Sequence, residues 1–164
     1  MGATSRYNRA LLVVEDDVTS KFIFETALRQ CGAAQVHVVS GTGEAMDYLS
    51  GKGPFADRKR YPFPSFILTE LNSPSVDGRA LLAELRKNPD WAAVPVAVFA
   101  SEATPEEVRC CYELGARTFH VVRGSYAEMR KELSRLHRYW AKCEVPRLPS
   151  SLPIKTRESQ RQLH

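Results

Sequence analysis

Several features that would restrict the class of this protein are missing from its sequence. No run of apolar residues approaches the ~20 that a membrane-spanning helix requires. The opening residues, MGATSRYNRA, lack the apolar segment of a signal peptide, and Arg6 stands where an N-myristoylation pattern needs Ser or Thr. We therefore expect a cytoplasmic protein that makes no contact with a membrane.

Cysteine is also scarce. The four cysteines, Cys31, Cys110, Cys111 and Cys143, show neither the spacing of a zinc site nor that of a disulfide framework. A reducing compartment fits this pattern. Cys110 and Cys111 are adjacent in a helical pattern, so we expect one thiol to face inward and the other outward.

A strong excess of one charge is absent as well, because the net charge is only +4. The basic residues gather in the run Arg58 to Arg60 and in a tail that contains Lys155, Arg157 and Arg161. Short basic runs without interleaved aromatic residues are weak evidence for nucleic-acid binding. We expect solvated loops there, and a nucleic-acid-binding adaptor remains an alternative.

What the sequence does contain is an alternation of short β-branched runs and amphipathic stretches, which is typical of a parallel sheet covered by helices on both faces. The runs are nearly continuous in apolar residues, so each predicts a strand buried on both sides. The expected strands are Ala10–Val14, Gln35–Val39, Ser65–Thr69, Val94–Phe99 and Thr118–Val122.

Amphipathic spacing predicts helices over Val18–Gln30, Thr42–Ser50 and Asp77–Lys87. Two further helix starts carry the pattern of a capping box, Thr104 with Glu107 and Ser125 with Glu128. We expect an N-terminal arm over residues 1–8, one domain over 9–141, and a Pro-rich basic tail over 142–164. The long connection from Gly51 to Pro64 is expected to be a surface loop.

Acidic side chains follow two of the expected strands. Glu15, Asp16 and Asp17 follow the first strand, and Glu70 follows the third. Ligands of an open parallel sheet collect outside the carboxyl ends of its strands, and carboxylates gathered there raise one another's pKa unless a cation intervenes. Mg²⁺ suits such a cluster because it prefers hard oxygen ligands. The alternative is that Asp16 and Asp17 only cap the first helix.

The ordered motifs VVEDD, ILTELNSPSVDG, VPVAVFAS and GARTFHVVRG resemble the receiver domain of two-component response regulators over residues 9–141. The loop GPFADRKRYPFP and the ending HRYWAKCEVPRLP are similar to single-domain response regulators associated with bacterial phytochrome kinases. The resemblance implies a flavodoxin-like, doubly wound α/β fold with five parallel strands in the order 2-1-3-4-5.

The same resemblance assigns roles to individual residues. Glu15 and Asp16 match the acidic pair that holds a metal ion, and Asn72 matches the residue whose carbonyl completes that site. Glu70 stands at the position of the phosphoacceptor aspartate. The implied metal set is therefore Glu15, Asp16, Glu70 and Asn72, with Mg²⁺ as the ion.

Two switch positions of the family are changed as well. Ala100 stands where a hydroxyl senses the phosphoryl group, and Val122 stands where a lysine neutralises it. Glu70 is one methylene too long, and a misplacement of about 1 Å can cost ~100-fold in a positioned reaction. Ser101 and Arg123 carry suitable groups but are one residue out of phase with these positions. Strand alternation points Ser101 elsewhere, whereas a loop could bend Arg123 back. We expect a trans peptide bond at Arg123.

These departures favour a pseudo-receiver that is not an enzyme and acts through protein contacts, with Glu70 imitating a charged acceptor. One alternative is a receiver in which Glu70 or Asp17 still accepts phosphate. A phosphatase of the haloacid dehalogenase type is disfavoured because Glu15-Asp16-Asp17 lacks the DxD spacing.

The resemblance also implies partners, namely a sensor histidine kinase or phosphorelay protein, with a phytochrome-type kinase as one candidate, and a second copy of the chain. We expect a homodimer over the helix that begins near Thr104, the last strand and the last helix, with Tyr112, Tyr126 and Trp140 at its surface. The apolar stripe of the last helix is expected to form core or a dimer face. His120 is expected to be a hydrogen-bonded core histidine.

Overall fold

A single sheet of parallel strands forms the centre of the computed structural model, which describes residues 9–145. The strands are β1 (Ala10–Val14), β2 (Gln35–Val39), β3 (Phe66–Glu70), β4 (Val96–Ala100) and β5 (Thr118–Val121). The helices are α1 (Val18–Gln30), α2 (Thr42–Ser50), the 3-10 turn η1 (Gly53–Phe55), α3 (Gly78–Arg86), α4 (Pro89–Ala92), α5 (Pro105–Glu113) and α6 (Tyr126–Trp140). The strand order β2-β1-β3-β4-β5 confirms the prediction.

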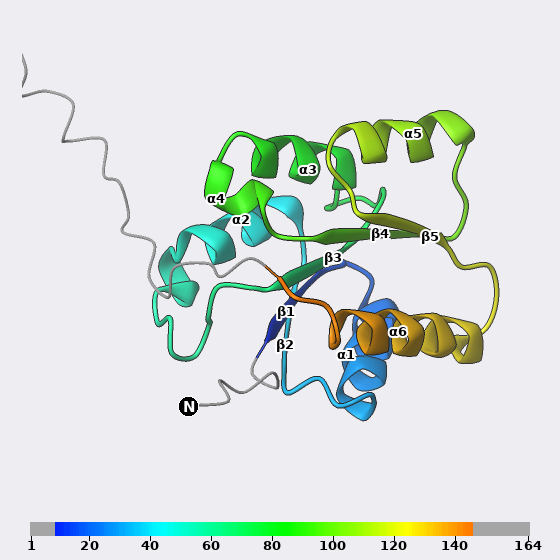
Figure 1. Cartoon of the computed structure of the whole chain (residues 1–164), viewed down its shortest axis with the longest axis horizontal. Coiled ribbons are helices and arrows are strands. Elements are labelled where there is room, and N and C mark those ends of the chain that lie inside the picture. Colours follow the sequence, from blue (N-terminus) through cyan, green and yellow to red (C-terminus); the bar gives the residue numbers. More distant parts are fainter. Residues whose placement is uncertain (1–8, 146–164) are drawn as a thin grey trace, which may run out of the picture.

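Helices cover both faces of the sheet, with α1 and α6 on one side and α2 to α5 on the other (Figure 1). Alternate residues of each central strand enter the two cores. In β1, for example, Leu11 and Val13 pack towards α1 and α6, whereas Leu12 and Val14 pack towards α2 and α3. This two-sided burial explains why the strands read as continuous apolar runs.

Two strands lie slightly later in the chain than the sequence predicted. Strand β3 covers Phe66–Glu70 rather than Ser65–Thr69, and β4 covers Val96–Ala100 rather than Val94–Phe99. Pro95 has no N–H and enters the ladder only through its carbonyl, which accepts from the Ile67 amide at 3.0 Å. The shift makes Glu70 and Ala100 the last residues of neighbouring strands.

The two predicted capping boxes differ in outcome. At α5 the Thr104 Oγ1 accepts from the Glu107 amide at 3.2 Å and the Thr104 amide donates to Glu107 Oε2 at 2.9 Å, which confirms the prediction. At α6 the prediction is wrong, because within the described residues the Ser125 hydroxyl accepts no hydrogen bond from a backbone amide of the first turn. The Glu128 carboxylate lies instead against Gly124, which has a φ of 130°.

Trp140 is part of the core, so its predicted place in a dimer face is wrong. Its side chain is only 6% exposed, and its ring stacks on Phe66 with 4.2 Å between the ring centroids. The helical spacing of the apolar residues in α6 predicted either a core position or a dimer face for them. The packing of Trp140 on Phe66 of β3 shows that this side chain belongs to the core. Tyr112 and Tyr126 are 48% and 42% exposed, as an interface requires.

The connection between α2 and β3 is largely exposed, as expected of a surface loop, but Arg58 and two aromatic rings anchor it to α2. Arg58 donates from Nη1 to the Tyr48 and Tyr61 carbonyls at 2.7 and 3.1 Å, and from Nη2 to the Leu49 carbonyl at 2.6 Å. Phe55 and Tyr61 pack on Tyr48 of α2. The Arg58 guanidinium is therefore an internal clamp rather than part of a free basic run.

The packed body continues past residue 141, because Cys143 and Val145 contact the core on the α1 and α6 side. No peptide bond among residues 9–145 is cis, which agrees with the trans bond expected at Arg123. None of the described helices is long and apolar enough to cross a bilayer. The arm over 1–8 and the tail residues Lys155, Arg157 and Arg161 lie outside the described residues.

Candidate functional site

The ends of β1 and β3 bring the predicted acidic residues to one edge of the sheet. The two strands pair in parallel, with Val14 opposite Thr69, so Glu15 and Glu70 follow at the same level. The Glu15 amide donates to the Val39 carbonyl of β2 at 3.0 Å, and the Leu71 amide donates to the Phe99 carbonyl of β4 at 2.9 Å. These backbone hydrogen bonds to the neighbouring strands therefore fix the backbone positions from which the Glu15 and Glu70 side chains extend.

Glu15 is the most buried of these acids, with 4% of its surface exposed. Its Oε1 accepts from the amide of Asp17 at 3.0 Å. Burial raises the pKa of Glu15, and the nearby Asp16 and Asp17 charges add to that effect, while the hydrogen bond from Asp17 opposes it. A buried carboxylate without a cation is costly to ionise.

Asp16 and Asp17 have separate structural roles. Asp17 is the N-cap of α1, where its Oδ1 accepts from the Ser20 amide at 2.7 Å, and the hydrogen bonds at Ser20 lower its pKa. Asp16 Oδ2 accepts from the Ser75 amide at 2.8 Å, across the cleft between the β1–α1 and β3–α3 loops. Helix capping therefore explains Asp17, whereas Asp16 joins the two loops.

Glu70 is a partly buried carboxyl whose Oε1 accepts from its neighbour, the Leu71 amide, at 3.1 Å. Burial raises the pKa of Glu70 to about 7, and the charge of Glu15 adds to that rise. Hydrogen bonds from Asn72 and Leu71 act in the opposite direction. Near neutral pH the Glu70 carboxyl is therefore divided between its neutral and ionised forms.

Gly78 allows the loop after β3 to fold tightly back on that strand. A Cβ added to Gly78 would stand 2.6 Å from the Glu70 carbonyl oxygen, so no larger residue fits without movement of the backbone. The bridge between Asn72 and Asp77 closes the same loop, and Asp77 caps α3 through the Arg79 and Ala80 amides. This geometry explains why Asp77 and Gly78 stand at the start of the third helix.

The predicted metal ligands provide suitable atoms but do not converge in this arrangement. Within residues 9–145 no group of three or more His, Cys, Asp or Glu side chains lies close enough together to hold a metal ion. Glu15, Asp16 and Glu70 are each directed at a backbone amide. Their oxygens suit a hard cation, yet the structure does not gather them with Asn72 into a ready-made site.

The two switch positions offer no polar group to Glu70. Ala100 is buried with 5% exposure, and Val122 packs on the core beside α1 and α6. Neither side chain can donate a hydrogen bond or carry a charge, as the sequence indicated. Residues 100 and 122 therefore supply neither a hydroxyl nor an ammonium group to Glu70.

Ser101 and Arg123 both line the same hollow as Glu70, which corrects the expectation for Ser101. The hollow holds about 590 Å³, and Asn72, Thr104 and Glu107 also line it. The sequence left open that a loop bends Arg123 back towards the site. Strand β5 ends at Val121, so residue 123 lies in such a loop.

His120 is satisfied by hydrogen bonds, as predicted. Its Nδ1 lies 2.8 Å from Glu132 Oε1 of α6, its Nε2 lies 2.9 Å from Thr118 Oγ1, and its ring stacks on Phe99. The contact with Glu132 joins β5 to α6. His120 is therefore structural.

Comparisons with known proteins agree with this geometry. No protein-family model matches the chain. The response regulator Rcp1 of Synechocystis is 26% identical over 152 residues, which cover 92% of this chain and 100% of Rcp1.

Solved structures show the fold. A response regulator in red-light signalling of R. palustris superposes with a TM-score of 0.78 at 24% identity, over 85% of this chain and 99% of that one. The bacteriophytochrome response regulator RtBRR superposes with a TM-score of 0.65 at 25% identity, over 89% and 85% of the two chains. The Mn²⁺-bound form of Rcp1 gives a TM-score of 0.74 at 24% identity, over 85% and 99%.

Proposed function

We propose that this protein is a single-domain response regulator of a pseudo-receiver type. Support comes from its receiver-domain fold and from its sequence similarity to the response regulator Rcp1. In this proposal it transmits a signal by protein contacts and without aspartyl phosphorylation. The observation that carries the proposal is Glu70 at the end of β3, in the position of the phosphoacceptor aspartate.

Three physical arguments support the loss of phosphorylation. The extra methylene of Glu70 displaces its carboxylate, and the raised pKa of about 7 leaves much of it protonated, which removes its nucleophilic charge. Ala100 offers no hydroxyl, and Val122 offers no ammonium to neutralise a transferred phosphoryl group. Each loss raises the barrier to phosphoryl transfer, because positioning and electrostatics supply most of its catalysis.

The same pKa limits how well Glu70 imitates a phosphorylated aspartate. A carboxyl that is partly neutral carries less than one negative charge, whereas a phosphate carries about two. The charge at residue 70 therefore depends on what approaches the edge of the sheet. A cation or a basic partner side chain would lower the pKa of Glu70 and fix it in the ionised form.

Mg²⁺ is the cation that we propose for this edge, with Glu15, Asp16, Glu70 and the carbonyl of Asn72 as its ligands. Support comes from the oxygen-rich donor set and from the Mn²⁺-bound form of Rcp1. Among the described residues Asp16 uses only Oδ2 to accept from the Ser75 amide, so its Oδ1 remains free to bind a cation. Because the carboxylates do not converge as described, no step of the function is assigned to the metal.

The partners in this proposal are a sensor histidine kinase or phosphorelay protein, with a phytochrome-type kinase favoured by the red-light and bacteriophytochrome regulators of the same fold. A homodimer over α5, β5 and α6 would use the exposed rings of Tyr112 and Tyr126. In this proposal the protein acts through such contacts and has no enzymatic activity of its own.

One observation favours a second candidate, a receiver that still accepts phosphate on Glu70. Arg123 lines the hollow beside Glu70 and could neutralise a phosphoryl group in place of the missing lysine. Asp17 is a weaker acceptor candidate because its carboxylate caps α1. The nucleic-acid alternative loses support, since Arg58 is bound to three backbone carbonyls.

The first prediction separates the two candidates. Acetyl phosphate and Mg²⁺ are added to the purified protein, and intact-protein mass spectrometry measures covalent phosphate. We expect no shift for the wild type, because the acceptor is misplaced and partly protonated. We expect a partial shift of one phosphate for the triple variant Glu70→Asp, Ala100→Thr, Val122→Lys, which restores the three missing groups.

Stoichiometric phosphorylation of the wild type would overturn the pseudo-receiver. In that case Glu70→Gln and Asp17→Asn identify the acceptor, and Arg123→Gln shows whether this cation assists the reaction. The triple variant serves as the positive control, and its thermal unfolding shows that it is folded.

A further inference from the structure

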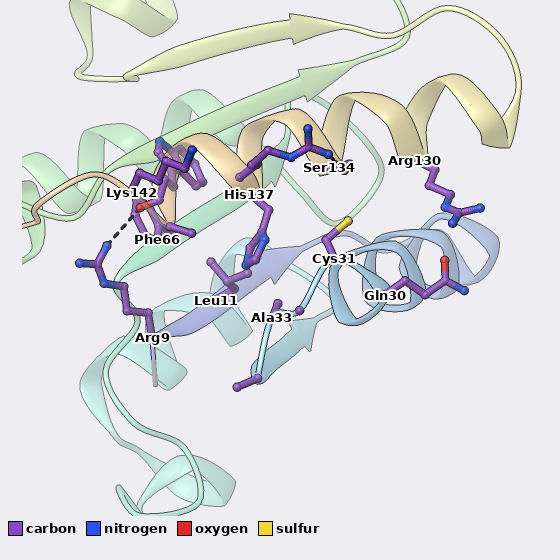
Figure 2. Close-up of a pocket in the computed structure, with 15 residues that line it drawn as sticks. Arg9, Leu11, Gln30, Cys31, Ala33, Phe66, Arg130, Ser134, His137 and Lys142 are labelled. Atoms are coloured by element: carbon purple, nitrogen blue, oxygen red, sulfur yellow. Dashed lines mark hydrogen bonds between the residues drawn. The ribbon is translucent and has the colours of Figure 1, made fainter. Parts of the chain in front are cut away.

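A second cavity lies at the end of the sheet opposite to Glu70. Its volume is about 670 Å³, within the roughly 300–1,000 Å³ of small-molecule sites. It is bounded by the start of β1 and β3, by the turn that follows α1, and by the second half of α6 (Figure 2). No residue proposed for the response-regulator function lies here except the misassigned Trp140.

The floor of this cavity is apolar and rigid. Leu11 and Phe66 are strand residues with 4% and 2% exposure, and Ala33 and Trp140 are 8% and 6% exposed. The Phe66 and Trp140 rings are nearly parallel, at 11°, and close the floor from below. Figure 2 shows Leu11 on β1, Ala33 on the loop after α1, and His137 on α6, and all three line the cavity.

The rim of the cavity carries positive charges, and no acidic side chain among the described residues of its lining neutralises them. Arg9, Arg130, Arg138 and Lys142 line it, and among the described residues no Asp or Glu does. The ion pairs found within residues 9–145 involve none of these four cations. Like charges gathered around one opening favour an anionic occupant, because such an occupant relieves their mutual repulsion.

Arg9 is held in place at one side of the opening. Its Nη1 donates to the Trp140 carbonyl at 3.1 Å (Figure 2). The same nitrogen donates to the Cys143 carbonyl at 2.8 Å. One nitrogen thus anchors the guanidinium, and the remaining N–H groups stay available as donors. A pre-positioned arginine loses little conformational entropy when it binds an anion.

We propose that this cavity binds a small amphipathic anion, with a flat apolar body on the Phe66 and Trp140 floor and a carboxylate, sulfonate or phosphate at the basic rim. The chain's own termini are poor occupants because their charge has the wrong sign. Residues 146–164 contain Arg147, Lys155, Arg157 and Arg161 against the single acid Glu158, and residues 1–8 contain Arg6 and no acid.

The test uses 8-anilinonaphthalene-1-sulfonate, an aromatic sulfonate whose fluorescence rises on binding, titrated into the full chain. Its uncharged analogue, N-phenyl-1-naphthylamine, measures the apolar contribution alone. Two triple variants are compared with the wild type. The cavity variant is Arg130→Gln, Arg138→Gln, Lys142→Gln, and the control variant, with the same loss of charge elsewhere, is Lys52→Gln, Lys59→Gln, Arg117→Gln.

We expect the sulfonate to bind with one-to-one stoichiometry and the cavity variant to bind it at least about tenfold more weakly, because charge-assisted hydrogen bonds are lost. The control variant should remain within about twofold of the wild type, since exposed charges away from the site are screened. Amide NMR shifts should change at Gly32 and at the Trp140 indole N–H. Thermal unfolding confirms that both variants are folded.

Three results would overturn the proposal. The first is equal binding of the sulfonate by the cavity and control variants, and the second is equally tight binding of the uncharged analogue by the wild type. The third is a hexaglutamate peptide that binds at the cavity more tightly than the sulfonate, because the surface would then serve an acidic protein partner. None of these results bears on the phosphorylation test, so the two proposals fail independently.

Discussion

At the scale of single residues, Glu70 combines a steric effect with an electrostatic one. In the proposed pseudo-receiver its side chain is one methylene longer than an acceptor aspartate, while burial and the neighbouring Glu15 raise its pKa to about 7. The first effect follows from the residue type and was visible in the sequence. The second depends on how β1 and β3 bring Glu15 and Glu70 together at the edge of the sheet.

This raised pKa predicts a pH dependence of stability. The unfolded Glu70 titrates at 4.5 and the folded one at about 7, so folding is most favoured by this group below pH 4.5, where both states are protonated. As the pH rises to 7 the unfolded state loses its proton first and stability falls, by up to roughly 2 kcal/mol after allowance for solvent screening. Glu70→Gln should remove this fall.

The measurement is chemical denaturation of the wild type and Glu70→Gln between pH 4 and 8, in a chelating buffer that excludes divalent cations. The difference between their unfolding free energies should grow in favour of the variant as the pH rises. Glu102→Gln, at an exposed carboxylate of the same hollow, is the matched control. A constant difference between wild type and Glu70→Gln across this range would contradict the account of Glu70.

At the scale of elements, the ends of strands and helices decide which side chains reach the site. Strand β5 stops at Val121, which releases Arg123 from strand alternation and allows it to line the hollow beside Glu70. Helix α5 begins with a complete capping box, whereas α6 begins without a side-chain cap at Ser125. The two helix starts look alike in sequence and differ in their contacts.

The difference between the two caps gives a matched pair of predictions. Thr104→Ala should destabilise the protein by about 1 kcal/mol, because the Glu107 amide loses its acceptor. Ser125→Ala should change stability by less than about 0.5 kcal/mol, because that hydroxyl makes no capping bond. Urea denaturation of both variants checks this, and equal effects would contradict the assigned cap geometry.

At the scale of the whole molecule, the two ends of the sheet have opposite character. The carboxyl ends of the strands carry Glu15, Asp16 and Glu70, whereas the opposite end has the cavity with a rim of arginines and Lys142. The exposed aromatic rings of Tyr112 and Tyr126 lie on α5 and at the start of α6. The molecule thus presents three chemically distinct surfaces to its partners.

The proposed homodimer leads to a prediction at this scale. The double variant Tyr112→Lys, Tyr126→Lys should shift the protein from dimer to monomer in size-exclusion chromatography with light scattering. The reason is that charged side chains would replace two rings that the proposed dimer interface buries. Phe22→Lys, at an exposed ring on α1 with 68% exposure, should leave the dimer intact. A wild type that is monomeric at every concentration would exclude this interface.

Much of the fold was open to prediction from sequence because its signals are local. The bounds of α1 and α2, the capping box at Thr104 and the buried strand runs follow from spacing and residue type within a few positions. The strand order and the place of Glu70 came from resemblance to receiver domains, and the described structure confirms the strand order.

The element pattern follows from residue identity and near neighbours in the chain, whereas the proposed match of residues 70, 100 and 122 to receiver positions rests on the resemblance. Tertiary structure alone decided that Trp140 stacks on Phe66, that Arg58 clamps α2, that Arg123 joins the hollow of Glu70, and that Arg9 meets α6. The physical reason is distance along the chain: these contacts join residues whose burial, charge and hydrogen bonds are set by packing between separate elements.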